Sequence, residues 1–256
     1  MLHKNFLKLR KSIFFLIIIF LGITNSIAQT KVIPVKSFVK VIVSPHIQVN
    51  FEQGDQESII IEDIDVPLEK FNVEENGKTL HIYLEGAKTV TKSEKVEEED
   101  RKVKRSIYKG TIVKATVIYK NLEELSLRGE ENFVCNSPLK TEKFDLKIYG
   151  ESEVDFINVN FNNLNTTIYG ENTLRIKSGV IGHHKITAYG ECEVKTLEVE
   201  SESVKITAYG EGEFRIMASD ELKVTAYGEA EVFYKGNPTI NKGIVLGDAE
   251  IKKISD

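Results

Sequence analysis

The sequence predicts an all-β fold: a right-handed parallel β-helix or β-roll of about 20-residue coils, with a β-rich N-terminal portion that continues the stack. A Gly-acid dipeptide recurs at Gly129-Glu130, Gly150-Glu151, Gly170-Glu171, Gly190-Glu191, Gly210-Glu211, Gly228-Glu229 and Gly247-Asp248. The successive steps are 21, 20, 20, 20, 18 and 19 residues. This period is too short for a helix pair or a propeller blade, so each repeat is expected to form one coil.

Residues 1–28 have the pattern of a secretory signal peptide. Lys4, Lys8, Arg10 and Lys11 precede an apolar run, and Ser26-Ile27-Ala28 then forms a small-residue cleavage site. No Cys follows that site, so lipid attachment is not expected, while a retained membrane anchor stays open as an alternative. The prediction is a protein exported to the periplasm, the cell surface or the medium, with no transmembrane segment in the mature chain.

Residues 29–122 lack the Gly-acid mark but keep the alternation of strands, with turn signals such as Asn76-Gly77 between them. This portion is expected to be β-rich, to include antiparallel hairpins and to extend the stack of residues 123–256. Within it, residues 91–106 are expected to form a charged mobile loop, because 11 of the 14 residues from Lys92 to Arg105 are charged.

Alignment of the repeats on their glycines assigns each column to a face, because strand side chains alternate between faces. Small or apolar residues mark the second and fourth columns after the glycine, and the second column before it, as inward. The first and third columns after the glycine are acidic and outward. The first contains Glu130, Glu151, Glu171, Glu191, Glu211, Glu229 and Asp248, and the third contains Glu153, Glu193, Glu213, Glu231 and Glu250.

Stacked carboxylates about 4.8 Å apart repel one another, so a compensating charge is required. Basic columns flank the acidic ones, for example Arg175, Lys195 and Arg215, and intrinsic ion pairing is the favoured explanation. A calcium ion is the alternative, although the spacing does not match that of the nonapeptide calcium-binding roll. No cofactor and no metal site are predicted.

A column of tyrosines stands immediately before the glycines: Tyr149, Tyr169, Tyr189, Tyr209 and Tyr227. These side chains are expected to point outward and to stack. Stacking stabilises a solenoid by itself, at about 0.5–1.5 kcal/mol per pair. The row beside the five carboxylates of Glu151, Glu171, Glu191, Glu211 and Glu229 is also a candidate strip for binding a glycan or a surface or matrix protein.

Charge and motif content exclude several functions. Without residues 1–28 the basic residues fall from 34 to 30 against 39 acidic ones, a net charge of −9, which argues against nucleic acid and anionic lipid as partners. Cys135 and Cys192 fall three coils apart, too far for a disulfide. His183 and His184 are adjacent on a strand and point to opposite faces, so they make a poor chelating pair. No nucleophile-elbow, triad or phosphate-loop motif is present.

The Tyr-Gly-Glu-x-Glu-Val blocks, the segment from Leu122 to Leu127, and the closing segments Tyr234 to Pro238 and Gly247-Asp248-Ala249 resemble one family. It is the putative auto-transporter adhesin head domain called GIN, and the resemblance covers about residues 38 to 254. Family members commonly carry Gly-Ser-Gly-Asp or Gly-Ser-Gly-Glu at the corner, whereas here Tyr or a similar bulky residue replaces the Ser-Gly lead-in. The resemblance implies adhesion at the cell surface and carries over no catalytic residues.

Three functions are compatible with these observations. The first is a secreted or cell-envelope, non-catalytic binding or adhesion module that uses the tyrosine and acidic columns. The second is a structural envelope spacer, with weak self-association through the open ends of the solenoid. The third is a polysaccharide-active enzyme, which the short uniform coils disfavour because they leave little room for long catalytic loops.

Overall fold

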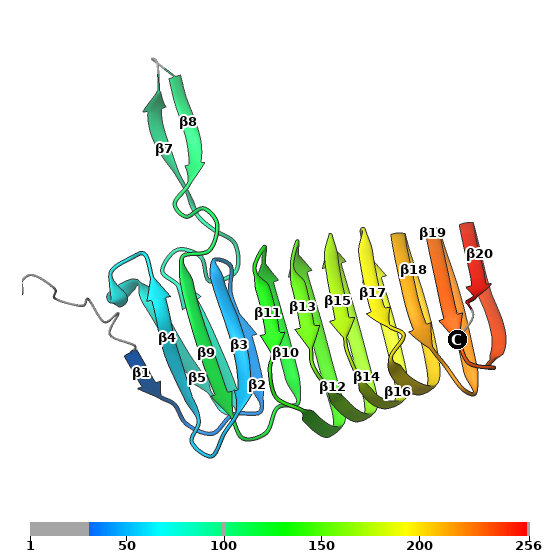
Figure 1. Ribbon diagram of the computed structural model, residues 1–256. Helices are drawn as coiled ribbons and strands as arrows, with labels where there is room; N and C mark the ends of the chain where they lie inside the picture. Colours follow the sequence, from blue (N-terminus) through cyan, green and yellow to red (C-terminus); the bar gives the residue numbers. More distant parts are fainter. Residues whose placement is uncertain (1–30, 99–100, 255–256) are drawn as a thin grey trace, which may run out of the picture.

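The computed structural model describes residues 31–98 and 101–254 and shows an elongated all-β molecule. An 18-stranded sheet winds into a solenoid, and the N-terminal strands join the same sheet at one end (Figure 1). The predicted signal peptide, residues 1–28, lies outside the described residues. No helix within the described ranges is long and apolar enough to span a membrane.

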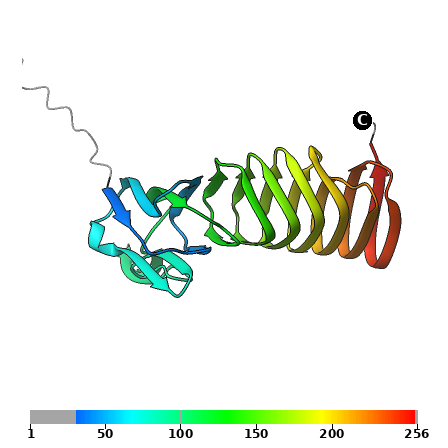
Figure 2. The same ribbon diagram turned by 90° about the horizontal axis from the view of Figure 1, so that it is seen from below.

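The solenoid coils stack in one line away from the N-terminal part (Figure 2). Their strands are β10 (Glu124–Gly129), β11 (Asn132–Cys135), β12 (Leu139–Gly150), β13 (Glu153–Phe156), β14 (Val159–Gly170), β15 (Asn172–Ile176), β16 (Gly179–Tyr189), β17 (Cys192–Thr196), β18 (Val199–Met217), β19 (Glu221–Lys235) and β20 (Thr239–Lys253). The early coils contribute two strands each, one on either side of the glycine corner. β18, β19 and β20 run through the corner as single long strands.

The parallel register between coils follows the glycine alignment that the sequence predicts. Gly129 pairs with Gly150, Gly150 with Gly170, Gly210 with Gly228, and Gly228 with Gly247. Every side-chain column of the sequence is therefore a physical row along the solenoid. This register confirms the solenoid of about 20-residue coils.

The core lies between the two walls, and the columns predicted as inward are buried. The fourth column after the glycine fills the centre with Phe133, Val154, Leu174, Val194, Phe214 and Val232. The column two residues before the glycine is buried up to Ala226, whereas Val245 in the last coil is 37% exposed. The exposure of Val245 reflects its position in β20, which has β19 as its strand partner on one side and none on the other among the described residues.

The N-terminal part continues both walls before it changes to antiparallel pairing. Its strands are β1 (Lys31–Pro34), β2 (Lys40–Val43), β3 (Ile47–Gln53), β4 (Ser58–Ile64), β5 (Phe71–Asn76), β6 (Thr79–Leu84) and β9 (Val113–Tyr119), with a 3-10 turn, η1 (Leu68–Lys70). β2 and β3 pair in parallel with β10 and β11, and β6 and β9 extend each wall by one more parallel strand. The β5–β6 pair is an antiparallel hairpin at the predicted Asn76-Gly77 turn, and the β4–β9 and β1–β4 pairs, which join strands distant in the sequence, are antiparallel as well.

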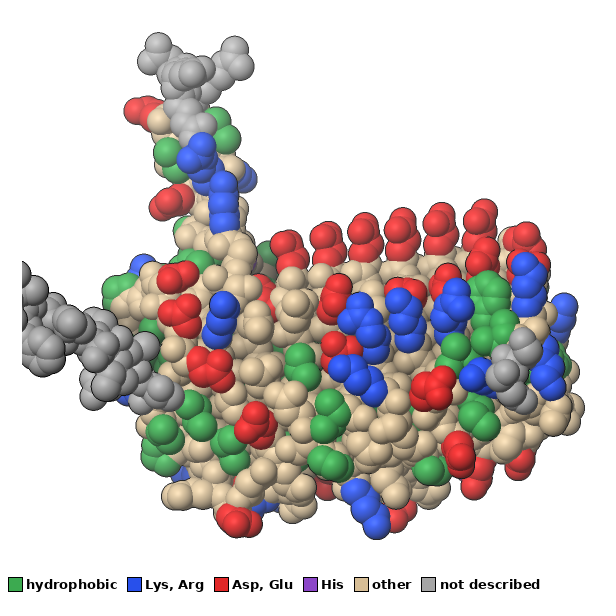
Figure 3. All heavy atoms as spheres, viewed as in Figure 1, with side chains coloured by type: hydrophobic (Ala, Val, Ile, Leu, Met, Phe, Trp, Pro, Cys, Tyr) green, Lys and Arg blue, Asp and Glu red, His purple; other side chains and the backbone are tan. Residues whose placement is uncertain are grey.

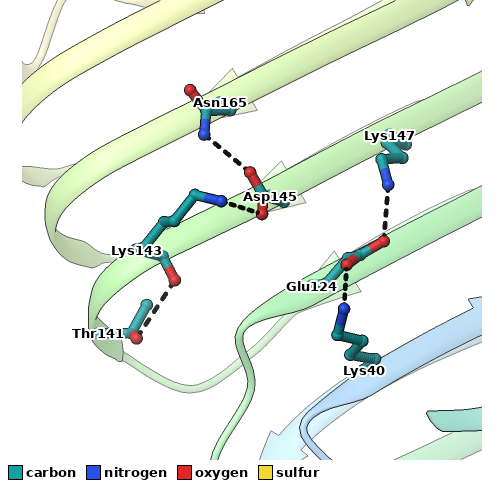
Figure 4. A network of polar contacts seen from close by, with 7 residues as sticks. All are labelled: Lys40, Glu124, Thr141, Lys143, Asp145, Lys147 and Asn165. Carbon is teal, nitrogen blue, oxygen red and sulfur yellow. Dashed lines mark hydrogen bonds and ion pairs between the residues drawn. The ribbon is translucent and has the colours of Figure 1, made fainter.

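A polar network joins the N-terminal part to the first coils (Figure 4). The Glu124 carboxylate on β10 lies 2.9 Å from the Lys40 ammonium on β2 and 2.7 Å from the Lys147 ammonium on β12. Burial of Glu124 opposes its ionisation, but hydrogen bonds from Lys147 and Lys40 outweigh burial and lower its pKa. One coil further along, Asn165 donates to Asp145 at 2.8 Å. These contacts cross successive strands and fix the register where the stack begins.

Residues 91–106 are not the loop expected from their composition. β7 (Ser93–Glu98) and β8 (Arg101–Ser106) form an antiparallel hairpin that projects from the N-terminal part (Figure 1). The strands place Glu94 opposite Arg105 and Val96 opposite Val103, so that opposite charges and β-branched side chains face each other. Such cross-strand pairs contribute about 0.2–1 kcal/mol each. The prediction counted the charges and missed that acidic residues dominate the first strand and basic residues the second.

Candidate binding surface along the solenoid

The glycine corners carry a continuous row of carboxylates, here called the acidic crest. It consists of Glu130, Glu151, Glu171, Glu191, Glu211, Glu229 and Asp248, all exposed. Their equivalent positions in consecutive coils bring them side by side along the upper edge of the solenoid (Figure 3). Within the ranges that the structure describes, none of the seven carboxylates has an ion-pair partner. The crest is thus an uncompensated line of negative charge.

The neighbouring acidic column behaves differently, because four of its carboxylates have basic partners. Glu193, Glu213 and Glu250 each pair with the residue two positions later, and Glu153 pairs with Arg175 of the next coil. Arg175 lies 2.9 Å from Glu153, Lys195 lies 2.6 Å from Glu193, and Arg215 pairs with Glu213. The Lys252–Glu250 pair, at 2.6 Å, repeats the arrangement in the last coil. The intrinsic ion pairing predicted from sequence therefore applies to this third column and not to the crest.

The five tyrosines form a single stacked row on the other side of the corner, here called the tyrosine row. Successive ring centroids from Tyr149 to Tyr227 are 5.2, 4.6, 4.8 and 4.9 Å apart, and neighbouring planes differ by 3–4°. The side chains are partly exposed, with Tyr169 at 40% and Tyr189 at 36%. Each inner ring has both faces covered by its neighbours, so the row presents ring edges to its surroundings.

A pocket of about 830 Å³ lies where the crest and the tyrosine row begin, at the base of the β7–β8 hairpin. The solenoid contributes the corner from Arg128 to Glu131 together with Tyr149 and Glu151. The N-terminal part contributes His46, and the segments flanking the hairpin contribute Val90 and Tyr108. This feature is here called the hairpin pocket, and the sequence analysis did not identify it. Two breaks in the columns mark it: Arg128 stands in the tyrosine column, and Glu131 stands in a column of small residues.

Glu131 is a buried carboxyl group, with 3% of the residue exposed. Its Oε1 accepts the backbone N–H of His46 at 3.1 Å, and its Oε2 accepts the backbone N–H of Glu130 at 3.0 Å. Burial raises the pKa of Glu131 to about 7, although the two backbone hydrogen bonds favour the ionised form. The group therefore changes charge near neutral pH.

His183 and His184 point to opposite faces of β16, as the alternation predicted. His183 Nδ1 lies 2.7 Å from the Ser203 hydroxyl at the surface. His184 is buried, its Nε2 lies 3.1 Å from Thr166 Oγ1, and burial lowers its pKa to about 3. Cys135 and Cys192 are buried free thiols, as predicted. Over the described parts of the chain, no three His, Cys, Asp or Glu residues are grouped so as to hold a metal ion.

The family comparison matches residues 37–238 to the family described as "Putative auto-transporter adhesin, head GIN domain". The chain belongs to this family. The match runs from the N-terminal part through most of the coils, so the GIN domain includes both the hairpin pocket and most of the acidic crest. Comparison with curated proteins gave no match.

Solved structures share the fold of this GIN domain. A putative adhesin from Bacteroides fragilis NCTC 9343 has a TM-score of 0.72 and 19% identity, covering 88% of this chain and 96% of its own. A putative adhesin from Parabacteroides merdae ATCC 43184 has a TM-score of 0.63 and 19% identity, with 89% and 96% covered. A putative lipid binding protein from Parabacteroides distasonis ATCC 8503 has a TM-score of 0.62 and 18% identity, with the same coverage. At these identities the likeness concerns the fold alone.

Glu131 should make the stability of the GIN domain depend on pH. Its pKa rises from an ordinary value of 4.5 to about 7 on folding, so the folded state holds the proton more tightly. The associated stabilisation is fully present below about pH 4.5 and is lost as the pH rises through about 7. Between about pH 5 and pH 8 the wild type should lose roughly 1–3 kcal/mol of unfolding free energy relative to Glu131→Gln.

Urea unfolding at the two pH values measures this difference directly. Glu191→Gln, which removes an exposed carboxylate far from the pocket, serves as the control and should follow the wild type. Parallel pH profiles for the wild type and Glu131→Gln would show that the raised pKa of Glu131 is wrong.

Proposed function

We propose that this GIN domain is an exported, non-catalytic adhesion module whose acidic crest and tyrosine row bind a basic surface on a partner protein. The observation that carries the proposal is the unpaired state of the crest, next to a column of the same residue type that is paired. A line of like charges repels itself, and a cationic partner would relieve that repulsion.

The geometry of the tyrosine row favours a protein over a glycan. A sugar stacks on the face of an aromatic ring, but the inner rings are about as close to each other as stacked rings can be. Their edges and hydroxyl groups stay accessible, and these groups suit hydrogen bonds to a partner surface. Regular coils also make the surface long and straight, so that many weak contacts can act together.

Export is part of this proposal and rests on residues 1–28, with their basic start, apolar run and small-residue cleavage site. The family description points the same way, because an auto-transporter adhesin acts outside the cytoplasm. Fractionation of cells that produce the protein, with N-terminal sequencing of the exported form, tests this part. A mature protein that begins near Gln29 is the expected result, and retention in the cytoplasm would contradict it.

Binding of the purified protein to an array of matrix proteins and glycans tests the adhesion proposal, with and without calcium. The test variant is the triple substitution Glu171→Gln, Glu191→Gln and Glu211→Gln in the crest. The matched control is Glu193→Gln, Glu213→Gln and Glu250→Gln, which removes the same charge from carboxylates that already have partners.

We expect selective binding to basic proteins that weakens with added salt and falls at least about tenfold in the crest variant. The control variant should retain most of the affinity. A Tyr169→Phe, Tyr189→Phe and Tyr209→Phe variant keeps the stacked rings and isolates the hydroxyl contribution. Equal binding by the crest and control variants, or no selective binding at all, would overturn the proposal and favour a structural spacer.

A further inference from the structure

The hairpin pocket has the composition of a small-molecule site. Its volume of about 830 Å³ lies within the range of about 300–1,000 Å³ that is usual for ligand pockets. It combines an apolar wall with a few charged groups that converge from different parts of the chain. The pocket meets the crest and the tyrosine row only at their first members, Glu130, Tyr149 and Glu151, and both rows then extend away from it along the solenoid.

Arg128 is the less exposed of the two cationic residues that line the pocket, the other being the exposed Lys109. Arg128 occupies the position that tyrosines hold in the next coils, and its guanidinium carbon lies 5.4 Å from the centroid of the Tyr149 ring. Its Nε is buried, and no described residue accepts a hydrogen bond from it. A buried donor with no acceptor is unfavourable, and a carboxylate is the acceptor that a guanidinium group pairs with most strongly.

The glutamates of the pocket have separate roles. The oxygens of Glu131 already accept two backbone N–H groups. Glu130 and Glu151 are adjacent members of the acidic crest, exposed at the edge of the pocket and without ion pairs in the described parts of the chain. Two neighbouring carboxylates favour a cationic group between them. A purely anionic ligand would add negative charge beside three glutamates, so the ligand should carry both signs.

Val90 and Tyr108 supply the apolar part of the pocket. The Val90 side chain is 78% exposed, in the segment just before the hairpin, and it lines the pocket together with Tyr108. The Tyr108 hydroxyl donates to the backbone carbonyl of Glu85 at 3.0 Å, which holds its ring in place. An apolar ligand side chain would cover Val90.

We propose that the hairpin pocket binds an apolar α-amino acid in its zwitterionic form. The carboxylate pairs with Arg128, the ammonium group lies between Glu130 and Glu151, and the side chain packs against Val90. No covalent step is involved. The site shares Glu130 and Glu151 with the first coils of the acidic crest, but the crest variant changes Glu171, Glu191 and Glu211, which do not line the pocket, so either proposal can fail without the other.

Isothermal titration of the purified protein with L-leucine, N-acetyl-L-leucine and L-leucine methyl ester tests each part of the recognition. N-acetylation removes the ammonium group and esterification removes the carboxylate. We expect L-leucine to bind with a Kd below about 1 mM, and both derivatives to bind at least about tenfold more weakly. Failure of L-leucine to saturate the protein near this concentration, or equal binding of N-acetyl-L-leucine, would overturn the proposal.

Arg128→Gln removes the positive charge and should weaken L-leucine binding at least about tenfold. Arg215→Gln is the matched control, because that guanidinium also lies over an aromatic ring, at 4.7 Å from Phe233, but far along the solenoid. The control should bind like the wild type, as should the Tyr169→Phe, Tyr189→Phe and Tyr209→Phe variant. Unchanged binding by a folded Arg128→Gln protein would place the ligand elsewhere.

Discussion

Gly170→Ala is expected to destabilise the solenoid by more than about 3 kcal/mol, or to prevent the affected coils from forming. Gly170 has φ of +99°, and a Cβ atom there would overlap the backbone carbonyl oxygen of Gly150 in the preceding coil. The neighbouring atoms are backbone held in a parallel ladder, so they have little freedom to move away. Strain in the backbone and a steric clash therefore act together.

Gly77→Ala is the control for backbone strain alone. Gly77 also has a positive φ, +60°, but a Cβ atom added there meets nothing within 4 Å. This substitution should cost about 1–2 kcal/mol, the penalty of a left-handed conformation. Urea unfolding followed by circular dichroism compares the two variants. A Gly170→Ala protein as stable as Gly77→Ala would mean that the coils are not packed backbone to backbone at the corner.

Phe144→Ala should cost about 3–5 kcal/mol of unfolding free energy. Phe144 is fully buried on β12, where its ring stacks on Phe161 at 4.9 Å and meets the edge of Phe156 at 6.0 Å. Removing the ring leaves a cavity that two other aromatic residues line. Because each coil contacts only its neighbours, the loss falls at the start of the solenoid, between the N-terminal part and the later coils.

Phe233→Ala removes the same side chain from a partly exposed position beneath Arg215 and should cost less than about 1 kcal/mol. Hydrogen exchange adds a test of location, because Phe144→Ala should reduce protection most in β10 to β14. A similar small loss for both variants would contradict the packing described for the first coils.

The repeat was readable from sequence because each coil uses the same few interactions. A strand buries alternate residues, so columns such as Phe133 and Val154 reveal the wall, and the glycines reveal the corner. The parallel register then places like residues side by side, which predicts the tyrosine row. The structure keeps these sequence patterns because each coil packs between neighbouring coils of the same kind, so that equivalent residues have the same environment in every coil.

The sequence was less informative where the chain departs from the repeat. The segment from Lys92 to Arg105 was predicted from its charge content alone. Its mainly acidic first strand pairs with a basic second strand, and this match becomes visible only when Glu94 is set against Arg105. The hairpin pocket was missed for a related reason. Arg128 and Glu131 are visible breaks in their columns, but Val90 and Tyr108 come from sequence positions with no repeat to align.

The sequence by itself determined the all-β solenoid, its period, its register and the rows of carboxylates and tyrosines, because these follow from side-chain alternation and a constant coil length. Only the tertiary structure decided which acidic column is paired and which is free. It also decided that Arg128 has a buried Nε without an acceptor beside the hairpin. The Glu153–Arg175 pair joins different coils, and the pocket beside Arg128 joins the solenoid to segments from elsewhere in the chain, so both depend on distances that no local pattern encodes.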